Sequence, residues 1–413
     1  MATFWKSILS LVVALLALVQ AERIEAQELF VTPSERVTRF VNVRELSSSD
    51  GDVVARLGPG ERLPLMDSGP GWREVRLDDG RSGFVSKSWT VVVPGPPPGG
   101  EQELRIHFLS VGAGTCTVVE CPGTGAPPII IDCGSSGGRG EMALERAEAR
   151  QRIQEILAEH DTAANVVLSH GDIDHYRWIP HVLGELSVQH IWQGGDPDTY
   201  GSDDFPQWIA DQEAHGAMIH RDFPVHWHND GQPLGDELSC GLASTFVLTV
   251  NSGAGGSTNT DSLVLMIEYE DFTAIFPGDA VGITEEFAEA NFRGAVKASV
   301  LSASHHGAAT FESNSAAWAE ATSPTVIVYS SGRLHGHPRC PVTEIYRPFL
   351  AAAPNHETHC NTTSDHEQRE IADSVLSEYT TDVVGSIVVS SNGRSPMRLA
   401  CAAGTDCGGE FPH

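Results

Sequence analysis

Short runs in which apolar and polar residues alternate fill residues 28–93, for example FVNVRE, VVARLGPGERLPLM and WREVRLDDGRSGFVS. A period of two, interrupted by turn residues, predicts half-buried strands. Asp79-Gly80 stands between two of these runs and is typical of a hairpin turn. This segment is therefore expected to form a small all-β domain.

The run PGPPPGG, residues 94–100, can sustain neither a helix nor a strand ladder, so it predicts a linker and a domain boundary. Beyond it, apolar runs such as LRIHFLS, PIIID, NVVLS and TVIVY predict buried strands. The stretch EMALERAEARQRIQEILAEH predicts a helix with Leu144, Ala147, Ile153, Ile156 and Leu157 near one face. Many strands and few helices predict a two-sheet sandwich flanked by helices over residues 101–400, followed by a tail at 401–413.

Residues 1–21 combine Lys6, an apolar run from Ile8 to Val19 and the small-residue ending Val-Gln-Ala. This pattern predicts a secretory signal peptide, because the apolar run is shorter than the roughly 20 residues that span a bilayer. No other stretch is expected to cross a membrane. We therefore expect a secreted or periplasmic protein.

The eight cysteines form an even set in a chain expected to be exported, which predicts disulfides. Cys401 and Cys407 are the most plausible local pair, and the sequence leaves the other pairings open. The formal net charge of −29 disfavours tight non-specific binding to nucleic acid. A substrate that carries phosphate would need bound cations to offset this charge.

The segment SHGDIDH, residues 169–175, follows the apolar run NVVL and places two histidines and two aspartates at a predicted strand end. By itself it fits either a polar turn or half of a metal site. Three more polar clusters also follow predicted strands: Asp279 in FPGDA, His305-His306 in SASHHG, and His337 in HGHP. Together they favour a site for two adjacent cations. A further histidine-rich stretch, His215 to His228, is interpreted as a surface loop.

The order HFLSVGAGTCTVVE, IIIDCG, SHGDIDH, NTDSLVLMIEY, FPGDA, ASHHG and HGHP resembles the ComEC-type branch of the metallo-β-lactamase superfamily over roughly residues 104–395. It is also similar to the phosphorylcholine esterases. The resemblance implies an α/β protein with an αββα sandwich. Residues 28–93 resemble a bacterial SH3-like domain, a family that often binds cell-wall peptides, although such a barrel can equally serve as a spacer.

The family pattern implies that His170 and Asp172 bind one metal ion and that Asp174 and His175 bind the second. Asp279 would bridge the two ions. Either His305 or His306 would complete the second set. His337 would be a further ligand, or else His337 or His306 would meet the leaving oxygen of the substrate. Asp132 would orient the ligands by hydrogen bonds, and Asn259 and Ser262 would lie near the substrate.

Many relatives carry a histidine where this sequence has Asp172. The additional carboxylate leaves zinc the first choice of metal and makes manganese a rival. By family analogy it favours a phosphodiesterase, acting on nucleic acid or a phosphorylated envelope polymer, in which two metal ions activate a water molecule. The alternatives are a hydrolase of lactones or carboxylic esters, or a cell-wall-binding protein without activity.

Overall fold

The computed structural model describes residues 29–34, 36–37, 40–58, 63–77, 81–94, 103–160, 162–202, 204–253, 257–292, 296–364, 368–394, 396–402 and 407–413. The chain divides into two compact units, Met1–Gly100 and Glu101–His413, which are described separately. The predicted signal peptide, the Asp79-Gly80 turn and almost all of the predicted linker lie outside the described residues. No helix in the described part of the chain has the length and apolar character needed to cross a membrane.

The first unit is all-β, as the alternating pattern predicts. Its strands are β1 (Leu29–Pro33), β2 (Val41–Arg44), β3 (Val53–Leu57), β4 (Leu63–Ser68), β5 (Trp72–Arg76), β6 (Ser82–Ser86) and β7 (Thr90–Pro94). They form one sheet in the order β3-β2-β6-β5-β4-β1-β7. Along β2, Val41 and Val43 are buried while the side chains between and after them are partly exposed. Alternate residues therefore build a small core that includes Val31, Leu57, Val75 and Val85.

The second unit contains two large sheets. The first has the order β13-β12-β11-β10-β9-β8-β22-β23-β24 and the second the order β14-β15-β16-β17-β18-β21. The strands of the first sheet are β8 (Leu104–Phe108), β9 (Cys116–Glu120), β10 (Ile129–Cys133), β11 (Ala164–Leu168), β12 (Val188–Gln193), β13 (Met218–His220), β22 (Ile387–Ser391), β23 (Met397–Cys401) and β24 (Gly409–Phe411). The strands of the second are β14 (Ser244–Thr249), β15 (Val264–Tyr269), β16 (Phe272–Phe276), β17 (Val300–Ser302), β18 (Val326–Tyr329) and β21 (Glu378–Thr380).

Both sheets are apolar on both faces, and this property produces the layers. In β10, Ile129 and Ile131 enter the core between the sheets, whereas Ile130 enters the core under the outer helices. In β15, Leu265 faces the core between the sheets and Met266 faces the opposite layer. When a sheet is covered on both faces, each of its strands has a nearly continuous run of apolar residues in the sequence. The result is the expected αββα sandwich.

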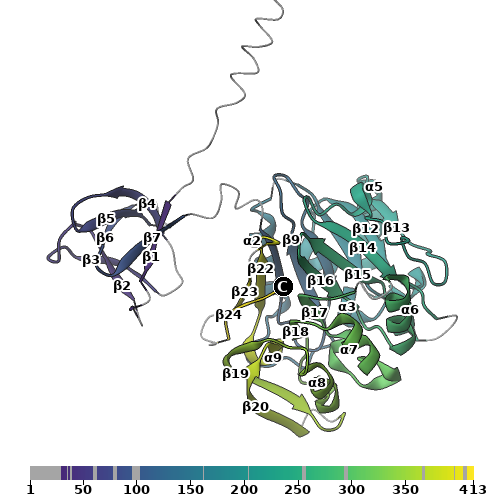
Figure 1. Ribbon diagram of the computed structural model, residues 1–413. Coiled ribbons are helices and arrows are strands. Elements are labelled where there is room, and N and C mark those ends of the chain that lie inside the picture. The colour runs from purple at the N-terminus through teal and green to yellow at the C-terminus, as the bar shows by residue number, and fades with distance from the viewer. Residues whose placement is uncertain are drawn as a thin grey trace, which may run out of the picture. The chain divides into compact units, whose positions relative to one another are not determined.

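The helices cover the outer faces of the two sheets. The first sheet carries α2 (Arg146–Leu157), α4 (Ile179–Leu183) and α5 (Phe205–Ala214), and the second carries α6 (Gly282–Phe292), α7 (Ala316–Thr322) and α8 (Cys340–Tyr346). The short helices α3 (Ile173–Tyr176) and α9 (Thr381–Val384) follow β11 and β21. A separate hairpin, β19 (Ala352–Asn361) with β20 (Arg369–Leu376), lies beside α8 (Figure 1).

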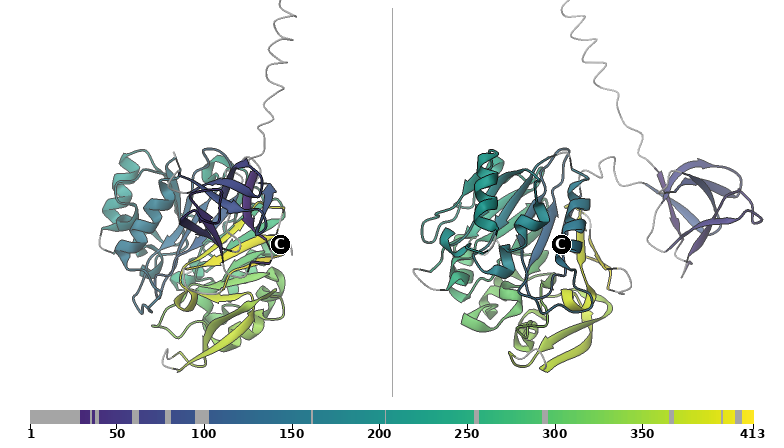
Figure 2. Two further views of the ribbon diagram at one scale, coloured as in Figure 1. Left: turned by 90° about the vertical axis from the view of Figure 1, so that its left-hand side faces the viewer. Right: turned by 180° about the vertical axis from the view of Figure 1, so that it is seen from behind.

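Two details of the sequence interpretation need correction. In α2 the buried residues are Ala149, Ile153 and Ile156, whereas Ala147 is exposed because it lies on the opposite side of the helix. The separate tail expected from residue 401 is also wrong. Strand β24 pairs with β23, and Phe411 is buried in the core between the sheets. Strand β24 thus forms one edge of this sheet, beyond β22 and β23, and β22 in turn pairs with β8. The C-terminus is marked in Figure 2.

All eight cysteines are paired. The bonds join Cys116 to Cys133, Cys121 to Cys240, Cys340 to Cys360 and Cys401 to Cys407, so the expected local pair is present. Cys116–Cys133 links the adjacent strands β9 and β10. These two strands lead into the part of the molecule where the polar clusters gather.

Candidate metal centre

The SHGDIDH segment forms a loop, here called the motif loop (residues 169–175), between the buried strand β11 and helix α3. His170 lies in the turn and is fully buried. Asp172 is the residue before the first turn of α3, although its side chain makes no capping bond, and Asp174 and His175 lie within the helix. The tight turn brings all four side chains to one edge of the sheet.

Asp132, at the end of β10, holds the motif loop from the neighbouring strand. Its carboxylate accepts hydrogen bonds from the backbone N–H of Ser169 (2.7 Å), from Ser169 Oγ (2.7 Å) and from His175 Nδ1 (2.8 Å). His170 Nδ1 lies 3.0 Å from Ser169 Oγ. Because these contacts occupy the Nδ1 atoms, the Nε2 atoms of both histidines are the ones left to bind a metal.

Asp279 follows β16 and lies between two sets of histidine nitrogens. Its Oδ1 is 3.0 Å from His175 Nε2 and 3.4 Å from His306 Nε2, and its Oδ2 is 3.5 Å from His305 Nε2 and 3.9 Å from His170 Nε2. The preceding Gly278 has φ +58°, and a Cβ there would lie 2.5 Å from Ser169 Cβ. Glycine at 278 therefore allows Asp279 to approach the motif loop closely.

The segment after β17, here called the histidine loop (residues 304–315), supplies the other two imidazoles. His305 and His306 both have left-handed backbone conformations, with φ of 48° and 55°. These turns direct the two rings to different oxygens of Asp279. His306 Nδ1 donates to the carbonyl oxygen of Ser330 at 2.8 Å, which leaves its Nε2 facing Asp174 Oδ2 at 3.6 Å.

The donor atoms fit divalent metal. Two overlapping groups, which share His175, have ligand atoms close enough together to hold an ion: His170, His175 and Asp279, and Asp174, His175 and His306. His170 Nε2 and Asp279 Oδ1 are buried and make no hydrogen bond of good geometry, although Asp279 Oδ1 lies 3.0 Å from His175 Nε2. Buried polar atoms that lack a partner are costly, and a metal ion would satisfy both. Nitrogen with carboxylate oxygen is a donor set that suits zinc and also admits manganese.

The cluster is strongly polarised even without an ion. Burial alone would raise the pKa of Asp174, but the hydrogen bond from His306 and the charges of His175 and His306 lower it to about 2. Burial opposes ionisation of Asp279 as well, yet the three nearby histidines hold its pKa well below the usual range. The carboxylates are therefore ionised at neutral pH, which is the state that binds metal.

His337 reaches the same cavity from the segment after β18. Its ring centre is 5.7 Å from that of His305 and 6.2 Å from that of His306. Burial, followed by the charges of His306 and His305, lowers the pKa of His337 to about 3. The imidazole is therefore neutral at neutral pH, so it can donate or accept a hydrogen bond but carries no charge.

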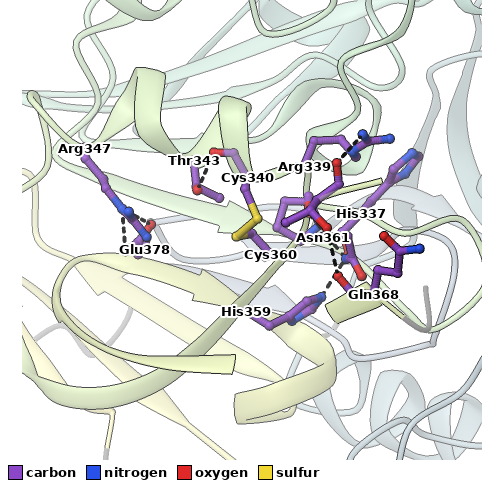
Figure 3. The surroundings of a disulfide bond; sticks show 12 residues. His337, Arg339, Cys340, Thr343, Arg347, His359, Cys360, Asn361, Gln368 and Glu378 are labelled. Carbon is purple, nitrogen blue, oxygen red and sulfur yellow. Dashed lines mark hydrogen bonds and ion pairs between the residues drawn. A yellow bond between two sulfur atoms is a disulfide. The ribbon is translucent and has the colours of Figure 1, made fainter. Parts of the chain in front are cut away.

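The β19–β20 hairpin fixes the main chain of His337 (Figure 3). The carbonyl oxygen of His337 accepts from His359 Nε2 at 3.0 Å and from Asn361 Nδ2 at 3.2 Å. Nearby, the backbone N–H of Arg339 donates to Gly307 at 2.9 Å. The Cys340–Cys360 disulfide joins α8 to β19 at the same place. The hairpin thus holds the carbonyl group of His337, and Arg339 joins the same segment to the histidine loop.

A cavity with a volume of about 600 Å³ opens onto these groups. Its lining includes Asp172, Asp174, Asp279, His305, His306 and His337, together with Ser136, Ile173, Thr310, Leu334, His335 and Ser364. Among the described residues that line it, none is a lysine or an arginine. The described lining therefore offers a phosphate no lysine or arginine, and bound cations would supply that charge.

Three sequence expectations do not match the positions found. Ser262 is fully buried and Asn259 almost so, and neither lines the cavity; Asn259 Nδ2 instead lies 3.4 Å from His305. His306 has both ring nitrogens engaged within the cluster, so none is left to meet a leaving oxygen. His220 belongs to strand β13 rather than to a loop, and its ring stacks on Trp192.

The sequence interpretation also missed the residues that support the histidine loop. Asn314 donates to the carbonyl oxygens of Ser304 and Ala308, each at 2.8 Å. Glu285, on α6, accepts from the backbone N–H groups of Asn314 (2.7 Å) and Ser315 (3.0 Å). A buried glutamate within an otherwise amphipathic helix was the available signal, but its partners are remote in sequence.

The model of the metallo-beta-lactamase superfamily matches residues 109–329, which is more than half of the chain. The chain therefore belongs to this superfamily, whose members are generally metal-dependent hydrolases. No curated protein matches.

Among solved structures, the chain is similar to CmlA, a diiron beta-hydroxylase from Streptomyces venezuelae, at 12% identity and a TM-score of 0.38, over 62% of this chain and 52% of CmlA. A mutant form of the CmlA beta-hydroxylase is 12% identical, with a TM-score of 0.35, over 58% of this chain and 47% of that one. A metallo beta lactamase from Hirschia baltica is 10% identical, with a TM-score of 0.25, over 57% of this chain and 87% of that one. The chain thus spans about half the length of the CmlA structures.

Proposed function

We propose that this protein is an exported, metal-dependent phosphodiesterase with two divalent ions at its centre. The observation that carries the proposal is the position of Asp279, whose two oxygens face different histidines. One ion would take His170, Asp172, His305 and Asp279 Oδ2. The other would take Asp174, His175, His306 and Asp279 Oδ1. Zinc is our first choice, with manganese as the rival.

Divalent ions bound there would supply a water nucleophile at neutral pH and offset the charge of a phosphate. The protein's own residues would orient and limit the reaction. Asp132 keeps His175 in the tautomer that presents Nε2, and Ser330 does the same for His306 through its carbonyl group. The neutral His337 faces the cavity and would hydrogen-bond to the leaving oxygen.

Three finer assignments belong to this proposal. We place the chain in the ComEC-type branch, on the strength of SHGDIDH, FPGDA and ASHHG. We regard the first unit as an SH3-like module that could bind a cell-wall peptide. Export is supported by the pairing of all eight cysteines, since stable disulfides are typical of oxidising compartments.

The variant Asp279→Asn tests the metal centre. Because Asp279 serves both sets of ligands, we expect the purified variant to hold far fewer than two equivalents of metal. Its activity on bis-p-nitrophenyl phosphate should fall at least about a hundredfold, since removing even the groups that support metal ligands costs 10- to 100-fold. Asp271→Asn, an exposed aspartate in the turn after β15, is the matched control. Metal content is measured by mass spectrometry and stability by urea unfolding.

A panel of substrates separates the alternatives. Zinc- or manganese-loaded protein is assayed on bis-p-nitrophenyl phosphate, a lactone and nitrocefin. Turnover of the lactone without turnover of the diester would replace phosphodiester cleavage by ester hydrolysis. A protein that carries no metal and turns over none of the three would instead be a binding protein.

A further inference from the structure

The mouth of the metal cavity carries apolar side chains that face solvent. Ile173 and Leu334 both line the cavity, and they are 41% and 40% exposed. Phe311 follows Thr310, another lining residue, and is 70% exposed, the highest value among the large apolar side chains in the described part of the chain. Ile173, Leu334 and Phe311 are here called the apolar rim; the first two line the cavity, and Phe311 is next to a lining residue in the chain. Exposed apolar groups at and next to a pocket mark a binding surface.

Phe311 is held in this position against the preference of its backbone. It has φ 53°, and its neighbours Glu312 and Asn314 are also left-handed. A non-glycine residue in this region costs about 1–2 kcal/mol. The conformation persists because Asn314 is fixed by its bonds to Ser304 and Ala308 and by Glu285. Strain that exposes a phenyl ring beside a reactive site is a reason to look for a ligand that uses it.

The remainder of the cavity is poorly suited to a polyanion. Its described lining contains three aspartates and no lysine or arginine. Arg333 precedes Leu334, but its guanidinium group packs against Gly140 and it does not line the cavity. Proteins bind nucleic-acid backbones by neutralising several phosphates with lysine and arginine. The bound metal ions would neutralise one phosphate and leave its neighbours opposed by a chain with a formal net charge of −29.

We propose that the substrate is a small phosphodiester with an apolar substituent, either an aromatic ring or an acyl chain, that packs on the apolar rim. This inference rests on the proposed phosphodiesterase function and narrows it. A polynucleotide is not the substrate class that the cavity fits. Leu334 and Phe311 are the residues that determine specificity.

Two diesters with the same leaving group test the inference: bis-p-nitrophenyl phosphate and methyl p-nitrophenyl phosphate. We expect Phe311→Ala and Leu334→Ala each to lower the ratio of their kcat/KM values about three- to tenfold relative to wild type, because an aromatic or aliphatic contact is lost. Met218→Ala, at an exposed site on β13 outside the cavity, should leave the ratio unchanged. Two further substrates are assayed: dihexanoyl phosphatidylcholine, whose substituents are acyl chains, and a 20-residue oligothymidylate, which is a polynucleotide.

Each outcome decides a different statement. If both alanine variants keep the wild-type ratio, or if the oligonucleotide is the best diester and is insensitive to Phe311→Ala, the apolar-substituent inference is wrong while the phosphodiesterase survives. The opposite case is a wrong phosphodiesterase assignment with a correct apolar rim. It is tested by calorimetry, which compares the affinity for diphenyl phosphate with the affinity for dimethyl phosphate. A protein that cleaves no diester but binds diphenyl phosphate through Phe311 and Leu334 would refute the phosphodiesterase and uphold the rim. A higher kcat/KM for the aromatic diester or for the acyl diester shows whether the apolar substituent is an aromatic ring or an acyl chain.

Discussion

The motif loop and the histidine loop contribute ligand atoms to the same centre, but the fold supports them in different ways. On the motif loop one carboxylate, Asp132, accepts three hydrogen bonds from two residues, and Thr258 also donates to Asp172 at 2.7 Å. The histidine loop depends on a distributed network that includes Glu285, Asn314 and the hydroxyl of Tyr346, which donates to Asn314 at 3.1 Å. The motif loop is thus held mainly from an adjacent strand, whereas the histidine loop is held by side chains from two helices, α6 and α8.

The largest effect that we expect concerns Glu285. Burial raises the pKa of this carboxyl to about 7, although it accepts hydrogen bonds from Asn314 and Ser315. The folded protein therefore retains a proton that the unfolded chain releases near pH 4.5. Stability from this group is fully present below that pH and is lost as the pH rises through 7, by about 3 kcal/mol. Urea unfolding at pH 5 and pH 8 measures the loss.

The comparison is made with Glu285→Gln, which cannot ionise and should lose most of this dependence on pH. Glu286→Gln changes an exposed neighbour on the same helix and should keep it. Equal slopes for wild type and Glu285→Gln would mean that the histidine loop is not supported by a protonated carboxyl group.

A smaller effect is expected at the motif loop, from Asp132→Asn. The amide would present N–H groups where the carboxylate accepts from His175 and Ser169, so His175 would lose the partner that fixes its tautomer. Affinity for zinc should fall 10- to 100-fold, which corresponds to roughly 1.4–2.8 kcal/mol. Competition with a chelator measures it.

Glu120→Gln is the matched control, because Glu120 also pairs with a buried histidine, His107, but lies outside the metal cavity. This variant should alter stability without altering zinc affinity. An unchanged affinity in Asp132→Asn would refute the positioning role. On the histidine loop the shorter contact of His306 Nδ1 is to the backbone carbonyl of Ser330, which no substitution removes, and Thr115 Oγ1 lies 3.4 Å from the same atom.

The same contrast explains what the sequence could predict. A two-sheet sandwich flanked by helices followed from the strand patterns, and the gathering of the polar clusters followed from motifs at strand ends, because those signals are local. The αββα arrangement was implied by the family resemblance. The sequence left open which of His305 and His306 is a ligand, since the left-handed turns that send the two rings to different oxygens of Asp279 have no local signature. Ser262 was placed near the substrate by family position, yet the structure buries its side chain completely.

The smallest predicted effect concerns glycine substitutions, which should raise the free energy of unfolding in the histidine loop and lower it in the motif loop. Phe311 has φ 53° and is mostly exposed, so Phe311→Gly removes backbone strain and little packing. We expect a gain of about 1 kcal/mol in the free energy of unfolding, even though the rim loses its ring. Ile173, at the start of α3 in the motif loop, is exposed and helical, and Ile173→Gly should lose about 0.5–1 kcal/mol. Urea unfolding of both variants measures the two changes in the free energy of unfolding. Phe311→Ala is the control, because it removes the ring but keeps the backbone strain. A loss of stability in Phe311→Gly would show that the phenyl ring is held by packing rather than exposed at a cost, and the histidine loop would then store no strain at this residue.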